Sequence, residues 1–381
     1  MLRVIVNRAI AEIASDKWNA LAGSDYPFLR HEFLLAAEES GCVSPETGWS
    51  PRHLTVEDDN GLLAAMPLYE KSHSWGEFVF DWAWANAYDQ AGLHYYPKLV
   101  SAVPFTPAPS RRLLLRDTAD NQSSAALLQG AIALARDTHC SSLHVLFPTA
   151  DEIGALSDAG LLIRKDCQFH WHNHHYRSFD HFLESFTSSK RKKARRDRRR
   201  VHESGIRFRR VRGGEIDDTR MSIVYRLISN TFMRRGSTPY FSEAFFRQLN
   251  RSLPDNILYV LAEHASSVVA AAVFFESELA LYGRYWGTDG HYDALHFETC
   301  YYQGIDYCIA TGKQLFEPGT QGEHKVSRGF SPVTTHSAHW LAHPQFASAI
   351  ERYLDEEGKH VERYIDEVDS HTPYKSTSEP Q

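Results

Sequence analysis

The chain has 381 residues, 43% of them hydrophobic and 23% charged, which is enough apolar sequence to bury a full core and to form two domains. The first residues contain no apolar core of signal-peptide length, and no segment approaches the roughly 18 apolar residues of a membrane-spanning helix. Composition therefore excludes an integral membrane protein and predicts a cytoplasmic one. The net charge is −7, and the five cysteines lack CxxC spacing, which predicts reduced, buried thiols.

The predicted elements occur in the same order twice along the chain. The first half shows two helices, a hairpin, a strand, a helix and a strand at Ala9–Ala22, Phe33–Ser40, His53–Glu57 with Leu62–Glu70, Lys98–Pro104, Ala125–Thr138 and Leu143–Phe147. The second half repeats this order at Asp218–Arg234, Glu243–Asn250, Ile257–Glu263 with Val268–Ser277, Ala280–Trp286, Leu295–Ala310 and Gln314–Glu317. Two copies of one α/β unit, each a mixed central sheet flanked by helices, explain the repetition.

The two copies join near Asn173–Phe179, where the pattern of the first unit ends. We therefore predict an N-terminal domain over residues 1–177 and a C-terminal domain over residues 178–369, the latter including a basic helix over 188–203. The polar ending SHTPYKSTSEPQ, residues 370–381, is predicted to be a disordered tail.

The basic helix concentrates the positive charge of the chain. Residues Lys190–Arg200 read KRKKARRDRRR, nine basic residues and one acidic in eleven positions, and the rest of the chain carries about −15. A concentrated charge of this kind predicts an anion site, and phosphate is the expected anion. The phosphate-binding candidates are Lys190, Lys193, Arg195, Arg196 and Arg199. The alternative is a solvated helix face, docked by a thin apolar seam that includes Ala194 and Val201.

Helix, helix, hairpin, strand, helix, strand is the order of the GNAT acyltransferase fold. Two long segments rich in Trp, Tyr, His and Gly, Gly76–Leu114 and Phe297–Trp340, closely resemble the FemAB-like family of bacterial N-acyltransferases, also described as peptidoglycan biosynthesis/recognition proteins. The resemblance covers nearly the whole chain. It implies an α/β class of fold with tandem GNAT-like units, related to the Fem aminoacyl ligases, which transfer an amino acid from aminoacyl-tRNA to a cell-wall precursor.

Acyl transfer to an amine requires a base, an oxyanion donor and a holder for the phosphates of the acyl donor. In CoA-dependent GNAT enzymes the holder is a Q/R-x-x-G-x-G/A turn, and the corresponding segment here, Arg284–Gly290, reads RYWGTDG. Asp289 stands where the pattern has glycine or alanine, and its carboxylate would repel a pyrophosphate. We expect no tightly bound cofactor, and the donor is either acetyl-CoA or another acyl-CoA, or an aminoacyl-tRNA. Arg284 and Tyr285 are substrate-binding candidates.

The loop after the strand Gln314–Glu317 is the candidate catalytic loop. Its glycines allow a ligand to approach the backbone, and four side chains supply acid, base and positive charge: Glu323, His324, Lys325 and Arg328. The Fem enzymes have a basic residue near a comparable Gly-Phe sequence, so the resemblance points to Lys325 or Arg328, and the choice between them stays open. A purely structural alternative is an ion pair between Glu317 and Lys325 across the turn.

In the first half, aromatic residues gather around one carboxylate and one amine. Rings that stack on a sugar or peptide, with a few polar groups to orient it, would make an acceptor site, for which the candidates are Asp81, Trp82, Tyr96 and Lys98. The alternative is a core packed with aromatic residues. Four prolines, Pro97, Pro104, Pro107 and Pro109, favour an irregular binding loop.

His170, His172 and His174 alternate along a predicted strand, but no acidic residue or cysteine lies at ligand spacing. We therefore predict an exposed strand face and no metal site.

Two functions remain for the whole chain. The first is an N-acyltransferase that delivers an acyl or aminoacyl group to a small-molecule amine acceptor. The acceptor is a cell-wall precursor or another phosphate-bearing small molecule, and tRNA is a candidate donor. If the precursor is linked to a lipid, the protein would contact the membrane only peripherally. The second is an RNA- or tRNA-binding module that uses the basic helix without catalysis.

Overall fold

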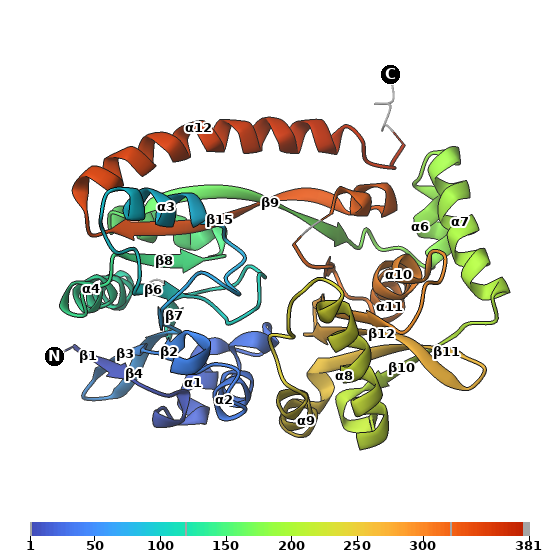
Figure 1. The fold of residues 1–381 in the computed structure, drawn as a ribbon, viewed down its shortest axis with the longest axis horizontal. Helices are drawn as coiled ribbons and strands as arrows, with labels where there is room; N and C mark the ends of the chain where they lie inside the picture. The colour runs from blue at the N-terminus through green and yellow to red at the C-terminus, as the bar shows by residue number, and fades with distance from the viewer. Residues whose placement is uncertain (1, 119, 321, 376–381) are drawn as a thin grey trace. The chain divides into compact units, whose positions relative to one another are not determined.

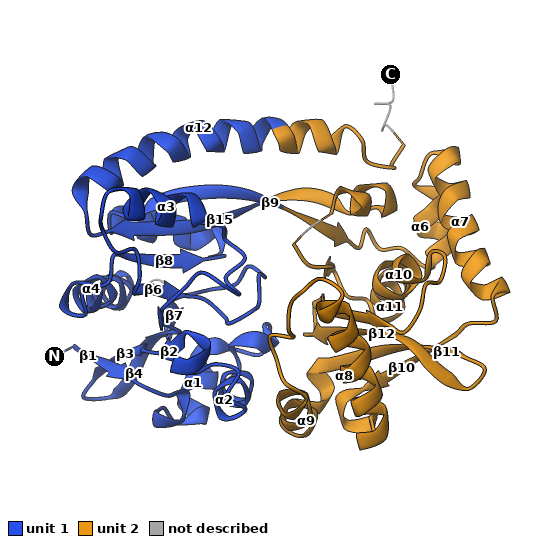
Figure 2. Ribbon diagram, viewed as in Figure 1, with its two compact units in different colours: residues 1–167, 334–363 blue, residues 168–333, 364–381 orange. Residues whose placement is uncertain are grey.

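The computed structural model describes residues 2–118, 120–320 and 322–375, and the chain divides into two compact units (Figures 1 and 2). Unit 1 is formed by the chain up to Cys167 together with Thr334–Arg363, and unit 2 by Gln168–Val333 together with the chain from Tyr364 onward. This division differs from the predicted boundary at residue 177, because a C-terminal strand and most of the last helix return to unit 1. Among the described residues, no helix is both long enough and apolar enough to span a membrane.

Unit 1 contains a four-stranded antiparallel sheet in the order β1-β3-β4-β7. Its strands are β1 (Arg3–Asn7), β3 (His53–Asp58), β4 (Gly61–Met66) and β7 (Leu114–Leu115), and its helices are α1 (Ser15–Ala22), α2 (His31–Glu39) and α4 (Asn121–Asp137). Helix α4 packs on β3 and β4 because its buried residues Leu127, Leu128, Ala131 and Ala135 recur at helical spacing (Figure 1).

The second sheet portion of unit 1 has the order β15-β8-β6-β5-β2. Its strands are β2 (Trp49–Pro51), β5 (Tyr69–Lys71), β6 (Lys98–Ser101), β8 (Ser142–Leu146) and β15 (Ser331–Leu341), with helices α3 (Trp82–Gln90), α5 (Ile153–Asp158) and α12 (Pro344–Asp369). Strands β6 and β8 are parallel, and β15 joins β8 in antiparallel pairing from Ser337 to Leu341. This pairing explains why Thr334–Arg363 belongs to unit 1.

Unit 2 is built on a sheet portion in the order β10-β11-β12-β13-β14-β9. Its strands are β9 (Leu162–His172), β10 (Arg207–Arg212), β11 (Ile257–His264), β12 (Ser267–Glu276), β13 (Ala280–Thr288) and β14 (Leu315–Glu317). Its helices are α6 (Phe179–Glu184), α7 (Ser188–Glu203), α8 (Asp218–Met233), α9 (Glu243–Ser252), α10 (Leu295–Phe297) and α11 (Gln303–Thr311), with a π-helical turn at Glu298–Tyr302 and a 3₁₀ helix at Glu323–Arg328. Strands β11 and β12 are buried along almost their whole length, as their near-continuous apolar sequence requires.

Three predictions about local structure were wrong. The aromatic segment predicted as an irregular loop forms helix α3, because the four prolines all lie C-terminal to that helix. The histidines do not share an exposed strand face: β9 ends at His172, and His170 is buried, which lowers its pKa to about 3.

The tail is the third difference. Residues 370–375 dock on unit 2: Thr187 N donates to Pro373 O at 2.8 Å, Lys375 N donates to Ser185 O at 2.9 Å, and the Tyr374 ring contacts Phe186. Tyr374 also donates its hydroxyl to Gly329 O at 2.5 Å. Composition alone predicted disorder here, whereas buried Pro373 and half-buried Tyr374 provide the apolar contacts that order the segment. The rest of the predicted tail, residues 376–381, lies outside the described residues.

Candidate functional site

A cavity of about 230 Å³ opens in unit 2 where two parallel strands separate. Strand β13 pairs with β14 only from Ala280 to Tyr282, opposite Leu315 to Glu317. Beyond this point the cavity, here called the strand cavity, is lined by Arg284, Tyr285, Trp286, Phe232, Arg235, His296, Cys300, Tyr301 and Pro318 among others. The two predicted substrate-binding residues of unit 2, Arg284 and Tyr285, therefore both line the same open cavity. Sequence reasoning missed His296, Cys300 and Tyr301.

A β-bulge aims Arg284 into the strand cavity. Between β12 and β13 the register shifts, so that Val273 opposes Tyr285 and Phe274 opposes Gly283, leaving Arg284 as the extra residue. Bulges of this kind redirect a side chain and occur next to active sites. The π-helical turn at Glu298–Tyr302, which brings in Cys300 and Tyr301, is a second irregularity that is common at functional sites.

Two buried ionisable groups accompany Arg284. Burial raises the pKa of Glu317 to about 8, against the opposing charge of Arg284. Lys325 is 2% exposed, and its Nζ donates to Gly319 O at 2.6 Å. Burial lowers the pKa of Lys325 to about 7, and the positive charge of Arg284 lowers it further, whereas Cys300 acts in the opposite sense. No ion pair joins the described side chains of Glu317 and Lys325, so the structural alternative for these two residues is wrong.

The other three loop candidates point in different directions. His324 lies among the rings of His296, Phe297 and Tyr301, and its Nε2 is 2.8 Å from the Tyr301 hydroxyl. Burial lowers the pKa of His324, so the ring is neutral near pH 7. Gly322 precedes it with φ +112°, and a Cβ at this glycine would lie 2.2 Å from the His324 ring. Only glycine therefore permits this arrangement.

Arg328 connects the candidate loop with the basic helix α7. Its guanidinium lies 3.3 Å from the Phe297 ring centroid and donates from Nη1 to His324 O at 2.5 Å. Its Nη2 is 3.9 Å from Asp197, the single acidic residue of the basic run. Arg328 is 4% exposed, so these contacts make it part of the scaffold of the loop.

Glu323 belongs to a second cavity of about 500 Å³, here called the tail cavity. This cavity is lined by Lys190, Glu323, Val326, Ser327, Tyr364, Glu367, Val368 and His371. Tyr364 donates its hydroxyl to Glu323 Oε1 at 2.9 Å. The structure thus separates the residues of the predicted catalytic set. Lys325 interacts electrostatically with Arg284, which lines the strand cavity, whereas Glu323 lines the tail cavity.

The basic helix α7 buries Ala194, Asp197 and Val201 and exposes most of its cations. Several arginines already have acidic partners: Arg195 with Asp180, Arg198 with Glu298, Arg199 with Glu203 and Arg200 with Asp293. Five cations form no ion pair with any described residue, and we call them the free cations: Lys190, Arg191, Lys192, Lys193 and Arg196. Four of the five lie in the N-terminal half, where the helix dipole is already positive and basic side chains destabilise the helix. Stability alone does not explain this placement.

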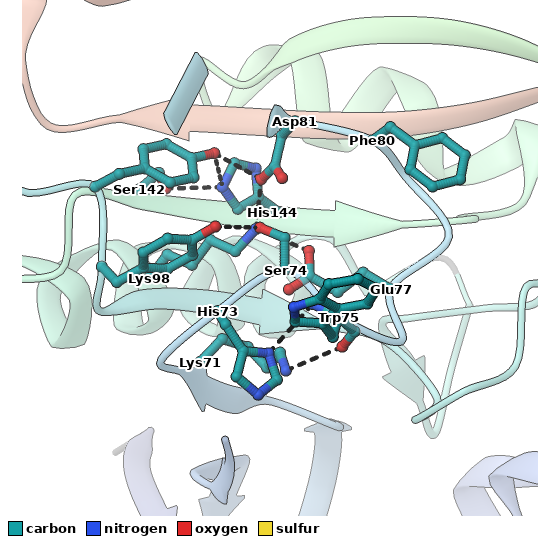
Figure 3. Close-up of polar contacts among 12 residues, drawn as sticks. Lys71, His73, Ser74, Trp75, Glu77, Phe80, Asp81, Lys98, Ser142 and His144 are labelled. Atoms are coloured by element: carbon teal, nitrogen blue, oxygen red, sulfur yellow. Dashed lines mark hydrogen bonds and ion pairs between the residues drawn. The ribbon is translucent and has the colours of Figure 1, made fainter. Parts of the chain in front are cut away.

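The predicted acceptor residues of unit 1 lie in a buried polar network (Figure 3). Lys98 is fully buried and donates to Ser74 Oγ at 2.7 Å, to Glu77 Oε2 at 2.8 Å and to Asp81 Oδ2. Tyr95 donates to Asp81 Oδ2 at 2.7 Å. Burial, the largest single effect, raises the pKa of Asp81, but the charge of Lys98, the charge of His144 and the hydrogen bonds from Lys98 and Ser74 together lower this pKa to about 2. The carboxylate therefore stays ionised beside Lys98.

The network continues through two histidines. His144 Nε2 is 2.7 Å from Ser142 Oγ, and His144 Nδ1 is 2.6 Å from Nδ1 of His339 on β15. Burial lowers the pKa of both rings, that of His144 to about 3. Both histidines are therefore neutral. Of the remaining acceptor candidates, Tyr96 is half-buried and reaches Ser74 with its hydroxyl at 2.9 Å, whereas Trp82 is exposed. Among the described residues, no group of three His, Cys, Asp or Glu side chains is arranged to hold a metal ion.

The turn after β13 carries exposed carboxylates. Asp289 and Asp293 are both exposed, and Asp289 N donates to Val269 O at 3.0 Å. Helix α8 packs directly against Gly287, and a Cβ at this position would lie 2.1 Å from the backbone of Leu227. This glycine thus serves the approach of a helix, and the turn presents negative charge to solvent.

Each unit is a mixed sheet flanked by helices, and the protein has a tandem GNAT-like fold. The chain belongs to the FemAB-like family, whose sequence pattern, described as peptidoglycan biosynthesis/recognition, matches residues 9–376. A comparison with curated protein sequences finds no match.

Solved structures with the same fold span nearly all of the chain. The C-terminal domain of a putative lysylphosphatidylglycerol synthetase from Agrobacterium fabrum is similar with a TM-score of 0.55 and 9% identity, over 90% of this chain and 96% of that one. FemX is similar with a TM-score of 0.55 and 11% identity, over 92% and 100%. L-PGS from Bacillus licheniformis is similar with a TM-score of 0.50 and 12% identity, over 87% and 98%. At these identities the likeness shows the fold alone.

Proposed function

We propose that the protein is an aminoacyltransferase, which moves an aminoacyl group from aminoacyl-tRNA to the amine of a cell-wall precursor. The strand cavity is the observation that carries the proposal. It lies where β13 and β14 separate, and it is lined by a redirected arginine and by Cys300, both of which interact electrostatically with the buried Lys325, whose pKa burial lowers to about 7. The family description and the printed names of FemX and the lysylphosphatidylglycerol synthetase support transfer to a cell-wall or lipid acceptor.

The reaction places clear demands on the residues of the strand cavity. A neutral amine attacks the ester carbonyl of the donor, the C–N bond forms, the ester C–O bond breaks, and the amine proton passes to the departing ribose oxygen. Arg284 provides a permanent positive charge for the oxyanion of the tetrahedral intermediate. Lys325 titrates near neutrality and can therefore accept the proton of the attacking amine and return it to the leaving oxygen.

Charge distribution supports tRNA over acyl-CoA as the donor. The turn that would hold the pyrophosphate of CoA presents Asp289, whose carboxylate repels phosphate, whereas Asp293 is paired with Arg200. Three of the free cations on α7, Lys192, Lys193 and Arg196, are instead exposed and can contact a phosphate backbone. Lys190 also lines the tail cavity, and Arg328 joins α7 to the loop that carries Lys325.

The proposal is tested with purified full-length protein, radiolabelled aminoacyl-tRNA and an amine-bearing peptidoglycan precursor. We expect label to appear on the precursor and aminoacyl-tRNA to be lost only when the precursor is present. Lys325→Met should lower the transfer rate about 100-fold, the usual contribution of a positioned acid–base group. Lys17→Met, an exposed lysine of unit 1, is the matched control and should leave the rate unchanged.

Two outcomes contradict the proposal. Consumption of acetyl-CoA, with micromolar binding in a calorimetric titration and no use of aminoacyl-tRNA, would make the protein a CoA-dependent acetyltransferase in spite of Asp289. Binding of tRNA without transfer to any amine acceptor would instead establish the RNA-binding module.

A further inference from the structure

Four large aromatic side chains of unit 1 are exposed to solvent. Trp75 is 64% exposed, Phe80 57%, Tyr353 50% and Trp82 38%. The rings of Trp75 and Trp82 lie 5.4 Å apart, edge to face. Aromatic residues normally contribute to the core or to an interface, and an exposed group of them marks a binding surface.

The segment that carries Trp75 and Phe80 is held in place by the buried polar network around Lys98. Lys98 binds Ser74, Glu77 and Asp81. These three residues alternate with the exposed aromatic residues along the sequence, so buried hydrogen bonds hold the segment at three places. Gly76 has φ +81°, and a Cβ there would lie 2.5 Å from the Phe105 ring. In Figure 3 the side chains of Ser74, Glu77 and Asp81 point toward Lys98, while the Phe80 ring points away from them. The segment that carries Trp75 and Phe80 is thus held in place by buried contacts.

A partly exposed ion pair connects the Phe80 backbone with the Tyr353 hydroxyl. Arg164 donates from Nε and Nη2 to the Glu357 carboxylate, both at 2.8 Å, and from Nη1 to Phe80 O at 2.8 Å. Tyr353 donates its hydroxyl to the same carboxylate at 3.0 Å. The side chains of Arg164 and Glu357 remain 14% and 20% exposed. The surface therefore combines flat apolar rings with oriented polar groups whose charges cancel.

We propose that Trp75, Phe80, Trp82 and Tyr353 form a platform that binds the glycan portion of the acceptor. A neutral sugar chain suits this surface, because sugar rings stack their C–H faces on aromatic rings while their hydroxyl groups hydrogen-bond to ion-paired side chains. A lipid surface suits it less well, because lipid chains offer no hydrogen-bonding groups to replace the water that the Arg164–Glu357 pair would lose. The role of the platform in acceptor binding rests on the proposed transferase function.

Glycan binding is measured without any acyl donor, so it succeeds or fails independently of transfer. The probes are an N-acetylglucosamine hexamer linked β-1,4 and soluble peptidoglycan glycan strands freed of their peptides, followed by tryptophan fluorescence and calorimetry. We expect both to bind, and the double variant Trp75→Ala/Trp82→Ala to lose about tenfold or more in affinity. Leu279→Ala is the control, because Leu279 is 51% exposed in unit 2 and should leave affinity unchanged.

Because both tryptophans are exposed, their removal should leave the fold intact, which the far-UV and thermal unfolding signals check. Absence of glycan binding by the wild type overturns the proposal, as does binding that the double variant retains. Binding to phosphatidylglycerol vesicles that is lost in the double variant, with no glycan binding, would identify the surface as a membrane contact instead.

Discussion

Neutralising part of the basic helix provides a quantitative test of the tRNA contact. The triple variant Lys192→Gln, Lys193→Gln and Arg196→Gln removes three of the five free cations and leaves every ion pair of α7 in place. The three side chains are exposed, and like-charge repulsion in the helix decreases, so the variant should be at least as stable as the wild type.

The expected magnitude follows from counterion release. Each phosphate contact contributes about −0.9 to the slope of log affinity against log salt, so five free cations give a slope of about −4.5 and two give about −1.8. Between 50 and 200 mM salt, the wild type should therefore lose about 500-fold in affinity for tRNA and the variant only about 12-fold.

Filter binding of labelled tRNA at several salt concentrations measures both slopes. The control variant Lys17→Gln, Arg226→Gln and Arg251→Gln removes the same charge from exposed positions elsewhere and should keep the wild-type slope. If the α7 variant also keeps the wild-type slope, the free cations do not contact the phosphate backbone and the reasoning fails.

Three further predictions concern unit 2. Because the pKa of Lys325 is lower in the folded state, unfolding takes up a proton, and the free energy of unfolding should rise as pH increases from about 7 towards 10.5. The variant Lys325→Met should be more stable than the wild type at pH 7 and show a smaller rise with pH. Urea unfolding at several pH values measures both effects. Gly287→Ala should lower the free energy of unfolding by about 1–3 kcal/mol because its Cβ overlaps the Leu227 backbone, and calorimetry would show the lower Tm. Tyr374→Phe should cost about 1 kcal/mol through the lost bond to Gly329 O, and an unchanged denaturant midpoint would contradict the docking of this segment.

Elements with strong periodic patterns could be predicted from the sequence. Helix α8 was expected at Asp218–Arg234 and occurs at Asp218–Met233, and β11 was expected at Ile257–Glu263 and occurs at Ile257–His264. Their apolar residues recur at helical or strand spacing, and local propensity agrees with the final environment. Strand β10 has four arginines in RFRRVR and carries no such pattern, so it was not predicted. Its structure is decided by its pairing with β11.

The sites could be predicted only in part, because burial depends on distant partners. Lys98 was expected to contact a ligand, yet it is fully buried by carboxylates 17 and 21 residues earlier in the chain. The partner of His144 lies 195 residues away. Arg284 and Lys325 were identified by residue type, but the bulge and the π-helical turn that bring Arg284 and Cys300 to the strand cavity leave no signal in composition or spacing.

The return of Thr334–Arg363 to unit 1 has a consequence for biosynthesis. Unit 1 is the first to leave the ribosome, yet strand β8 lacks its neighbour β15, and His144 lacks His339, until almost the whole chain has been made. A nascent chain released near Cys167 would present an open strand edge and a buried imidazole without its partner, both of which favour aggregation. Unit 1 therefore completes its fold after translation of unit 2, and chaperone dependence during this interval should exceed that of a protein with two contiguous domains.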